Sequence, residues 1–350
     1  MKSLFLSLFL ATFFVASTQG QSGSRDRAFI PTGITYSLPK TVIVVQIQAV
    51  KTIRLVGPYY QYTERYLGTR DVITKNSVQW SVQDVKILTK PVPDEQNTFF
   101  IKPDPASSAS YVALTPNGLL CGLNVPSETI AAPADHSSAT PTPVTPNLEF
   151  NNLILTEDLL QANSIARMAE VAAKQIYNLR DSRISLITGN LDKVPDGSAL
   201  KEMLAQMDKS ENDLMELFVG KTVTIPTTVT FEIIPAQEVN NEVLFRLSNE
   251  NGVVGRGDLS GQPYYLNVKD ITSPKPSSGA DRGGDNALFY RVPGKALITL
   301  VDPSGNVIAK SSVTMAQFGA IQALPSSLFG KNQVKVHIDP STGALLSIEK

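Results

Sequence analysis

The sequence predicts an α+β fold: an N-terminal antiparallel β domain, a central α-helical hairpin and a C-terminal antiparallel, β-sandwich-like domain. Short alternating apolar segments fill the first third of the chain and return after the middle. Two amphipathic segments with three- and four-residue spacing lie between these β regions, behind a stretch rich in Pro, Ser and Thr. The expected parts are a signal peptide (1–20), the first β domain (28–125), a linker (126–149), the hairpin (150–220) and the second β domain (221–350).

The N-terminus has the layout of a secretory signal peptide. Lys2 precedes an apolar run from Leu4 to Ala16, small and polar residues follow, and we expect cleavage after Gly20. An uncleaved anchor is the alternative, although the run is short for a membrane span. No Cys follows the run to carry a lipid, and no later segment is apolar enough to cross a bilayer. We therefore expect an exported protein of the periplasm or cell envelope, without a lipid anchor or a transmembrane segment.

The first β region contains two long alternating segments. "KTVIVVQIQAVKTIRL" (40–55) alternates apolar and polar residues, and so does "VQWSVQDVKIL" (78–88). In the second segment the alternation slips between Val82 and Val85, which indicates a β-bulge. Shorter strands are expected at "TFFI", "YVAL" and "LLCGLNV", the last two joined by the turn "TPNG". Between the long segments, "YYQYTERYLG" is typical of one or two helical turns ending on Gly68.

The middle of the chain has the pattern of two helices. A capping pattern at Thr156 opens the first, which Gly189 ends, and Gly220 ends the second, "SALKEMLAQMDKSENDLMELFVG". A short connection containing "PDG" predicts that the two helices form an antiparallel hairpin. After residue 221, many short β-rich segments favour an antiparallel sandwich or barrel over a parallel sheet.

Charge and motif order exclude two classes of ligand. The formal net charge of −1 argues against a polyanionic partner, because nucleic-acid-binding proteins carry a concentrated basic surface. Gly220-Lys221-Thr222 resembles the end of a phosphate-binding loop, but it follows a predicted helix and precedes a predicted strand. A phosphate loop needs the opposite order, so that a helix N-terminus faces the anion. We therefore expect neither nucleic acid nor nucleotide as a ligand.

No constellation of residues predicts a catalytic centre. The chain has two His residues and no Gly-x-Ser-x-Gly motif, which makes a Ser-His-Asp triad or a His-rich zinc site improbable. Ser37 and Ser198 each stand three residues before a Lys, but the Lys-Thr-Gly motif of acyl-serine enzymes is absent. Cys121 lies among apolar residues and is expected to be a buried, inert thiol. We therefore expect no catalytic residue and no cofactor.

Three segments could nevertheless bind a ligand. A tyrosine-rich group could form a stacking surface for a peptide or a glycan, or its rings could instead complete the core of the first domain and cover its edge. The members of this group are Tyr59, Tyr60, Tyr62, Arg65 and Tyr66. A Gly-rich loop offers a weak candidate site for a hard cation, whose ligands would be Asp281, Asp285 and Asn286. "GRGD" (255–258) contains an adhesion-like tripeptide, which the needs of a hairpin tip explain equally well.

Several segments together resemble an uncharacterised domain-of-unknown-function family of exported Bacteroidetes proteins. They include "YSLPKTVIVVQIQAVKT", "GPYYQYTERYLGTRDVITKNSVQWSVQDVKI", "YNLRDSRISLITGN", "ELFVGKT" and "ALFYRVPGKALITLVD". The resemblance covers nearly the whole chain, from 30 to 350. It implies a location in a Gram-negative envelope and marks residues 59–68, 180–189 and 289–294 as signature segments. It implies no activity.

The expected function is a non-enzymatic role in the envelope, in which the protein binds another protein or a glycan. One alternative is a carboxylate-dependent hydrolase, similar in its chemistry to a glycosidase, because a carboxylate pair assembled across strands is invisible in one sequence. Another alternative is a structural subunit of an envelope oligomer, in which an exposed apolar face of the hairpin contacts a further copy of the chain.

Overall fold

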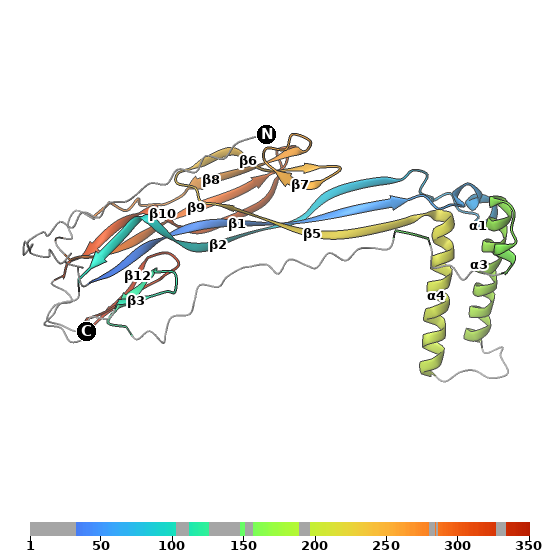
Figure 1. The fold of residues 1–350 in the computed structure, drawn as a ribbon, viewed down its shortest axis with the longest axis horizontal. Coiled ribbons are helices and arrows are strands. Elements are labelled where there is room, and N and C mark those ends of the chain that lie inside the picture. Colours follow the sequence, from blue (N-terminus) through green and yellow to red (C-terminus); the bar gives the residue numbers. More distant parts are fainter. Residues whose placement is uncertain are drawn as a thin grey trace, which may run out of the picture.

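The protein is built mainly from antiparallel β-sheets with a few helices, in agreement with the predicted α+β class. The computed structural model describes residues 33–102, 112–125, 148–150, 157–188, 197–279, 284, 286–326 and 334–350. The predicted signal peptide and residues 126–147 of the predicted linker lie outside this part of the chain. In Figure 1 long strands form an extended body, and helices stand at one end of it.

A three-stranded sheet of order β2-β1-β5 runs along the molecule. Its strands are β1 (Ile34–Leu55), β2 (Ser77–Ile101) and β5 (Lys221–Ile233). The predicted bulge in the second segment is confirmed, because Gln48 pairs with Asp84 whereas the next residue, Ala49, pairs with Val82. The separate strand expected at "TFFI" is wrong, since β2 continues without interruption to Ile101.

A five-stranded sheet of order β10-β9-β8-β6-β7 packs against this long three-stranded sheet, which we call the ribbon. Its strands are β6 (Val239–Ser248), β7 (Gly252–Gly255), β8 (Gln262–Asp270), β9 (Leu288–Val301) and β10 (Val307–Leu324). The segment "LFYRVPGKALITLV" forms the single strand β9. Strand β9 continues past Pro293 because its partner β10 bulges between Met315 and Ala320, where the ladder loses its regular pairing.

The largest core lies between these two sheets. Ile43, Val45 and Ile47 of β1 are fully buried against the five-stranded sheet. Their neighbours in the sequence point to the opposite face, as the two-residue period of a strand requires. The residues of the five-stranded sheet that complete this core include Phe245, Leu266, Val268, Ala296, Ile298, Leu300 and Met315.

A four-stranded sheet of order β12-β11-β4-β3 covers the other end of the ribbon. It consists of β3 (Val112–Leu114), β4 (Leu120–Leu123), β11 (Lys335–Ile338) and β12 (Leu345–Glu349). It encloses a second core with the start of β1 and the end of β2. The pairings of β1 with β5 and of β4 with β11 join strands from both predicted β domains. The limits of those domains stay a prediction.

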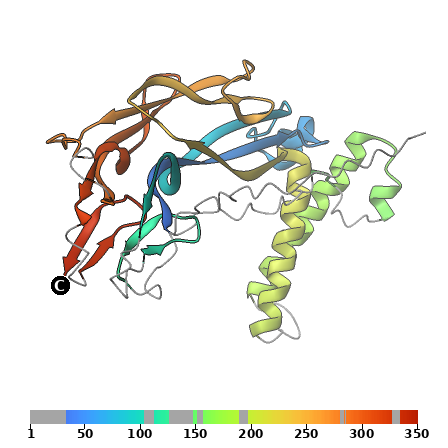
Figure 2. The same cartoon turned by 60° about the vertical axis from the view of Figure 1, so that its left-hand side comes forward.

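Helices occupy the middle of the sequence, but the run expected from Thr156 to Gly189 as one helix is interrupted at residues 161–164. Short helical turns η1 (Tyr60–Tyr62), α1 (Thr63–Leu67) and α2 (Glu157–Leu160) accompany the long helices α3 (Ile165–Thr188) and α4 (Gly197–Val219). The two long helices stand side by side at the end of the ribbon (Figure 2) and share a third apolar core. None of the helices in the described part of the chain is long and apolar enough to cross a membrane.

Glycines end helices where the sequence predicts. Gly68 has φ +68° after α1, and Gly220 has φ +91° after α4, so both adopt the left-handed conformation that favours glycine. Gly220 donates its N–H to the carbonyl of Glu216, and β5 begins at the next residue. The Gly-Lys-Thr segment therefore has the order helix, turn, strand, which is not the order of a phosphate-binding loop.

Candidate binding groove between two sheet edges

Strand β5 has one unpaired edge. It is the outermost strand in the order β2-β1-β5, and within the described residues no strand pairs with its other side. The N–H and C=O groups along that edge are free to bind another strand. The sequence of β5, "KTVTIPTTVTFEI", carries charges only at Lys221 and Glu232. The outer edge of this strand is therefore both open and nearly uncharged.

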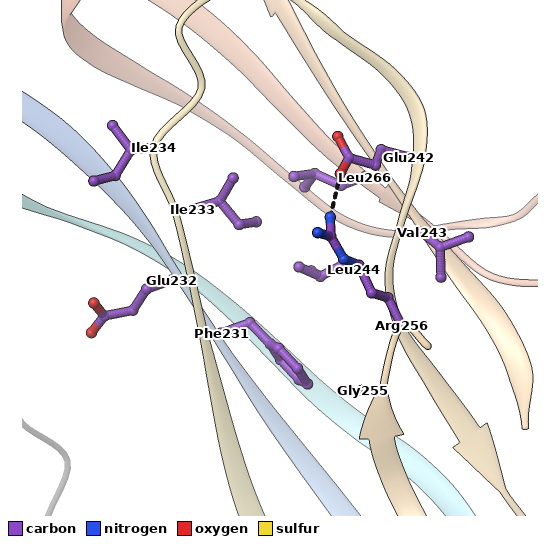
Figure 3. Close-up of a pocket in the computed structure, with 10 residues that line it drawn as sticks. All are labelled: Phe231, Glu232, Ile233, Ile234, Glu242, Val243, Leu244, Gly255, Arg256 and Leu266. Atoms are coloured by element: carbon purple, nitrogen blue, oxygen red, sulfur yellow. Dashed lines mark hydrogen bonds and ion pairs between the residues drawn. The ribbon is translucent and has the colours of Figure 1, made fainter. Parts of the chain in front are cut away.

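A cavity of about 460 Å³ lies between this edge and the β6–β7 hairpin (Figure 3). Strand β7 pairs with β6 only from Phe245 to Ser248, so the first half of β6 also has an open edge. The chain passes directly from the end of β5 into β6 across residues 234–238, which brings the two open edges together at one corner of the sandwich. Two unpaired strand edges therefore border the same groove.

The floor of the groove is apolar and aromatic. Phe231 and Ile233 point from β5 toward β6 in Figure 3, and Leu244 and Leu266 line the cavity from the five-stranded sheet. The ring of Phe231 stacks on that of Phe245, with 5.7 Å between centroids. This stacked pair links the two sheets beneath the groove and gives it a rigid base.

Charged side chains at the mouth of the groove are paired with each other. Arg256 donates a hydrogen bond of 2.8 Å to the carboxylate of Glu242. Arg246 fixes the turn behind them, since its Nε donates to the carbonyl of Arg256 and its Nη1 to that of Gly261, both at 3.1 Å. The mouth therefore presents a neutral ion pair on a well-held turn.

The "GRGD" segment forms the turn after β7. Arg256 is engaged with Glu242, and the carboxylate of Asp258 accepts a hydrogen bond of 2.9 Å from the backbone N–H of Ser260. That backbone hydrogen bond holds the pKa of Asp258 below its ordinary value. Both charged groups of the motif thus have structural partners, that of Arg256 in strand β6 and that of Asp258 within the turn.

Two glutamates line the cavity without facing each other. Glu242 points toward Arg256, whereas Glu232 lies on the side of β5 opposite to Phe231 (Figure 3). On that side Glu232 accepts a hydrogen bond of 2.6 Å from Lys90 of β2. The alternation of side chains along β5 explains the separation of the two carboxylates.

The tyrosine-rich segment lies at the C-terminal end of α4. The last carbonyls of a helix have no partner within it. Here the carbonyl of Leu217 accepts a hydrogen bond of 2.8 Å from the N–H of Tyr59. The carbonyl of Phe218 accepts one of 3.0 Å from the hydroxyl of Thr63. The carbonyl of Val219 accepts one of 2.9 Å from the N–H of Ile73. The segment therefore serves as the C-terminal cap of this helix.

The five residues of the predicted tyrosine-rich group differ in their surroundings. Tyr59 is buried and meets Phe218 edge to face at 5.5 Å, and Tyr60 is half-buried beside them. Tyr62 and Tyr66 pack partly against the helices, with their rings 6.2 Å apart. The guanidinium of the exposed Arg65 lies 5.4 Å from the ring of Tyr66. A ligand-binding role for this group stays a prediction.

The weak cation site falls largely outside the described residues. Asp281 and Asp285 are not described, and Asn286 contacts the backbone of Lys102 with both ends of its amide. Within the described residues no group of three or more His, Cys, Asp or Glu is arranged to hold a metal ion.

Cys121 is buried in β4, as predicted, and burial raises the pKa of its thiol.

A buried ionic cluster lies elsewhere between the sheets. Asp94 of β2 accepts hydrogen bonds from Arg291 of β9 at 2.7 Å and from Asn97 at 2.7 Å, and it forms an ion pair with Lys40 at 2.9 Å. Burial opposes ionisation of Asp94, but the hydrogen bonds from Lys40 and Asn97 outweigh it and hold its pKa below the ordinary value. The cluster borders no described cavity, and its geometry indicates a structural role.

A family model described as a domain of unknown function (DUF4831) matches residues 32–346. The chain belongs to this family. The DUF4831 match includes all strands that border the groove and both long helices. The comparisons found no match among curated proteins or among solved structures.

The groove has no clear signature in the sequence. Its main residues, among them Phe231, Leu244 and Arg256, come from different strands and carry no motif. One local signal was present: the β5 segment of the DUF4831 match is long, rich in β-branched residues and almost free of charge. That composition is unusual for a strand edge left open to solvent.

Proposed function

We propose that this is an exported protein of the cell envelope that binds a protein or glycan partner in the β5–β6 groove and catalyses no reaction. The observation that carries the proposal is the open cavity between two unpaired strand edges. The N-terminal apolar run supports export.

The dimensions and lining of the groove support binding. Ligand sites usually measure about 300–1,000 Å³ and have a mainly apolar lining with a few polar groups. The cavity of about 460 Å³ fits this range, and among the described residues that line it the charged ones are Glu232, Glu242 and Arg256. Because Phe231 stacks on Phe245 beneath the groove, a partner would meet a preorganised apolar floor.

A carboxylate-dependent hydrolase is the rival proposal. Such an enzyme needs two carboxyl groups that flank the bond to be cleaved, about 5–10 Å apart. Glu232 and Glu242 both line the cavity, but Glu232 points away from it and pairs with Lys90, while Glu242 pairs with Arg256. This geometry supports binding better than hydrolysis.

A structural subunit of an oligomer is a further proposal with one feature in its favour. Ile184 and Ile187 of α3 are 59% and 66% exposed, which is high for large apolar side chains on a helix. A concentration-dependent mass in sedimentation equilibrium, abolished by Ile184→Lys together with Ile187→Lys, would support self-assembly through this helix.

Two glycines offer a matched test of the groove. A Cβ atom added at Gly255 or at Gly257 meets no atom within 4 Å, but only Gly255 lines the cavity. The wild-type chain, Gly255→Phe and Gly257→Phe would be immobilised and exposed to envelope extract and to a glycan array. We expect the wild type and Gly257→Phe to retain a partner that Gly255→Phe does not. Retention of nothing by the wild type, or equal retention by all three chains, would contradict the proposal.

A further inference from the structure

We propose that the partner in the groove is a polypeptide segment in extended conformation, which adds as a strand to the outer edge of β5 along Thr227–Ile233. This inference rests on the proposed binding function and names the class of partner. A strand edge offers alternating N–H donors and C=O acceptors, and another strand in the same sheet satisfies both.

The position of a proline shows which groups of β5 face outward. Pro226 lies opposite Val50 in the antiparallel ladder with β1. Opposite residues alternate between hydrogen-bonded and non-hydrogen-bonded pairs, and proline has no N–H to give. Pro226 therefore occupies a non-hydrogen-bonded position. The residues at the same phase, Thr228, Thr230 and Glu232, direct their N–H and C=O groups away from β1, into the open edge.

Two prolines limit the outward-facing run, the part of β5 whose alternate residues direct their N–H and C=O groups to the open edge. Pro226 precedes it and Pro235 follows it, so the backbone donors between them form one uninterrupted edge. This edge ends beside the cavity, because Phe231–Ile234 line it. An added strand would therefore have hydrogen-bonding partners on one side and the groove beneath it.

The two edges of the same sheet differ in their protection against pairing. Edge strands are usually protected by charges and prolines. Strand β2, at the other edge, follows this rule with Asp84, Lys86, Lys90, Pro91, Pro93, Asp94 and Glu95. Strand β5 has one charge in its outward-facing run, Glu232, and that side chain is paired with Lys90. The unprotected edge is the one that borders the cavity.

The groove also defines the side chains that the added segment carries. A new strand would lie about 4.8 Å beyond β5, and its residues opposite Val229, Phe231 and Ile233 would point to the same face as these side chains. That face is the cavity lined by Leu244 and Leu266. The partner segment would therefore carry apolar residues at alternate positions. The ion pair of Glu242 and Arg256 leaves the mouth without net charge, so the segment needs no charge of its own there.

Two prolines placed at equivalent sites test the inference. Thr230 and Thr224 are both exposed threonines of β5, at the phase of Pro226, so neither N–H is used in the ladder with β1. Only Thr230 lies within the proposed binding run Thr227–Ile233, directly before Phe231, which lines the cavity. Thr230→Pro and Thr224→Pro should therefore unfold at similar temperatures, whereas only Thr230→Pro removes a donor from the proposed binding edge.

The probe is a phage-displayed library of random linear peptides, selected on the mature wild-type chain. We expect enriched sequences with alternating apolar residues and no proline among them. The best peptide should bind Thr230→Pro about tenfold or more weakly than wild type, and Thr224→Pro within about twofold. N-methylation of this peptide at alternate residues should abolish binding in one phase and leave it nearly unchanged in the other.

The outcomes separate this inference from the proposed function. Failure to enrich any peptide, or equal loss of affinity in both proline variants, would overturn strand addition. A partner that Thr230→Pro retains and Gly255→Phe loses would overturn it too, while leaving the proposed binding function intact. If Thr230→Pro alone converts a dimer of the free protein to a monomer, the edge pairs with a second copy and the peptide assignment is wrong.

Discussion

Arg291 of β9 donates a hydrogen bond of 2.7 Å from Nη2 to the carboxylate of Asp94 of β2, and neither side chain is more than 5% exposed. The pair joins the first long hairpin of the chain to the five-stranded sheet across the interior. Because a buried charge without its partner is costly, this contact gives a sharp prediction about stability.

Asp94→Asn should reduce the free energy of unfolding by about 3–5 kcal/mol, because it leaves Arg291 and Lys40 without their counter-charge. Glu64→Gln removes the exposed ion pair with Arg70 and should cost about 0–1 kcal/mol. Urea unfolding followed by circular dichroism measures both changes. Equal effects of the two substitutions would mean that the Asp94 cluster does not stabilise the fold.

The carboxylate of Asp94 should also make the stability of the fold depend on pH. The folded-state pKa of Asp94 lies below the ordinary value of 3.8, so its contribution is fully present above about pH 5 and is lost as the pH falls through the folded-state pKa. The stability difference between wild type and Asp94→Asn should therefore shrink as the pH falls from about 5 to about 2. A difference that stays constant, or grows, would contradict the assignment.

Replacing Gly220 by alanine should lower the stability of the fold more than the same replacement at Gly68. Gly68 and Gly220 both have positive φ after a helix, but a Cβ at Gly68 meets nothing within 4 Å. At Gly220 it would lie 2.5 Å from the carbonyl oxygen of Leu55. Gly68→Ala should cost about 1 kcal/mol, from backbone strain alone, and Gly220→Ala about 3 kcal/mol or more. Thermal unfolding of the two variants gives the comparison, and similar midpoints would refute the close approach.

Replacing Tyr59 by alanine should destabilise the protein more than replacing Tyr60. Tyr59 is 7% exposed and packs on Phe218, whereas Tyr60 lies outside the core formed with the helices. Tyr59→Ala should cost about 3–4 kcal/mol and Tyr60→Ala about 1 kcal/mol or less. Limited proteolysis of α3 and α4 would show whether the helices lose their attachment in Tyr59→Ala. Unchanged resistance to protease would mean that Tyr59 does not hold them.

Local features of the fold could be predicted from the sequence because they depend on neighbouring residues. The slip between Val82 and Val85 marks the observed bulge, and Gly68 and Gly220 end the helices that precede them. Strand β2 is longer than predicted, because an edge strand tolerates the prolines that break the alternating pattern.

The groove could not be predicted, because it arises from pairing over long distances in the sequence. Strand β5 lies beside β1, so that Ile233 pairs with Ile43, and no local pattern specifies that partner. The tyrosine-rich segment shows the same difficulty. Its aromatic residues suggested a binding surface, whereas its position at the end of α4 depends on a helix that begins at Gly197, far along the chain.

Residue-resolved amide hydrogen exchange of the free protein tests the open edge of β5 most directly. If the edge is unpaired, the amides of Thr228, Thr230 and Glu232 should exchange rapidly, while those of Val229, Phe231 and Ile233, bonded to β1, should be protected. Uniform protection along this run would show that the edge is already covered, and would contradict the account of the groove as a binding site.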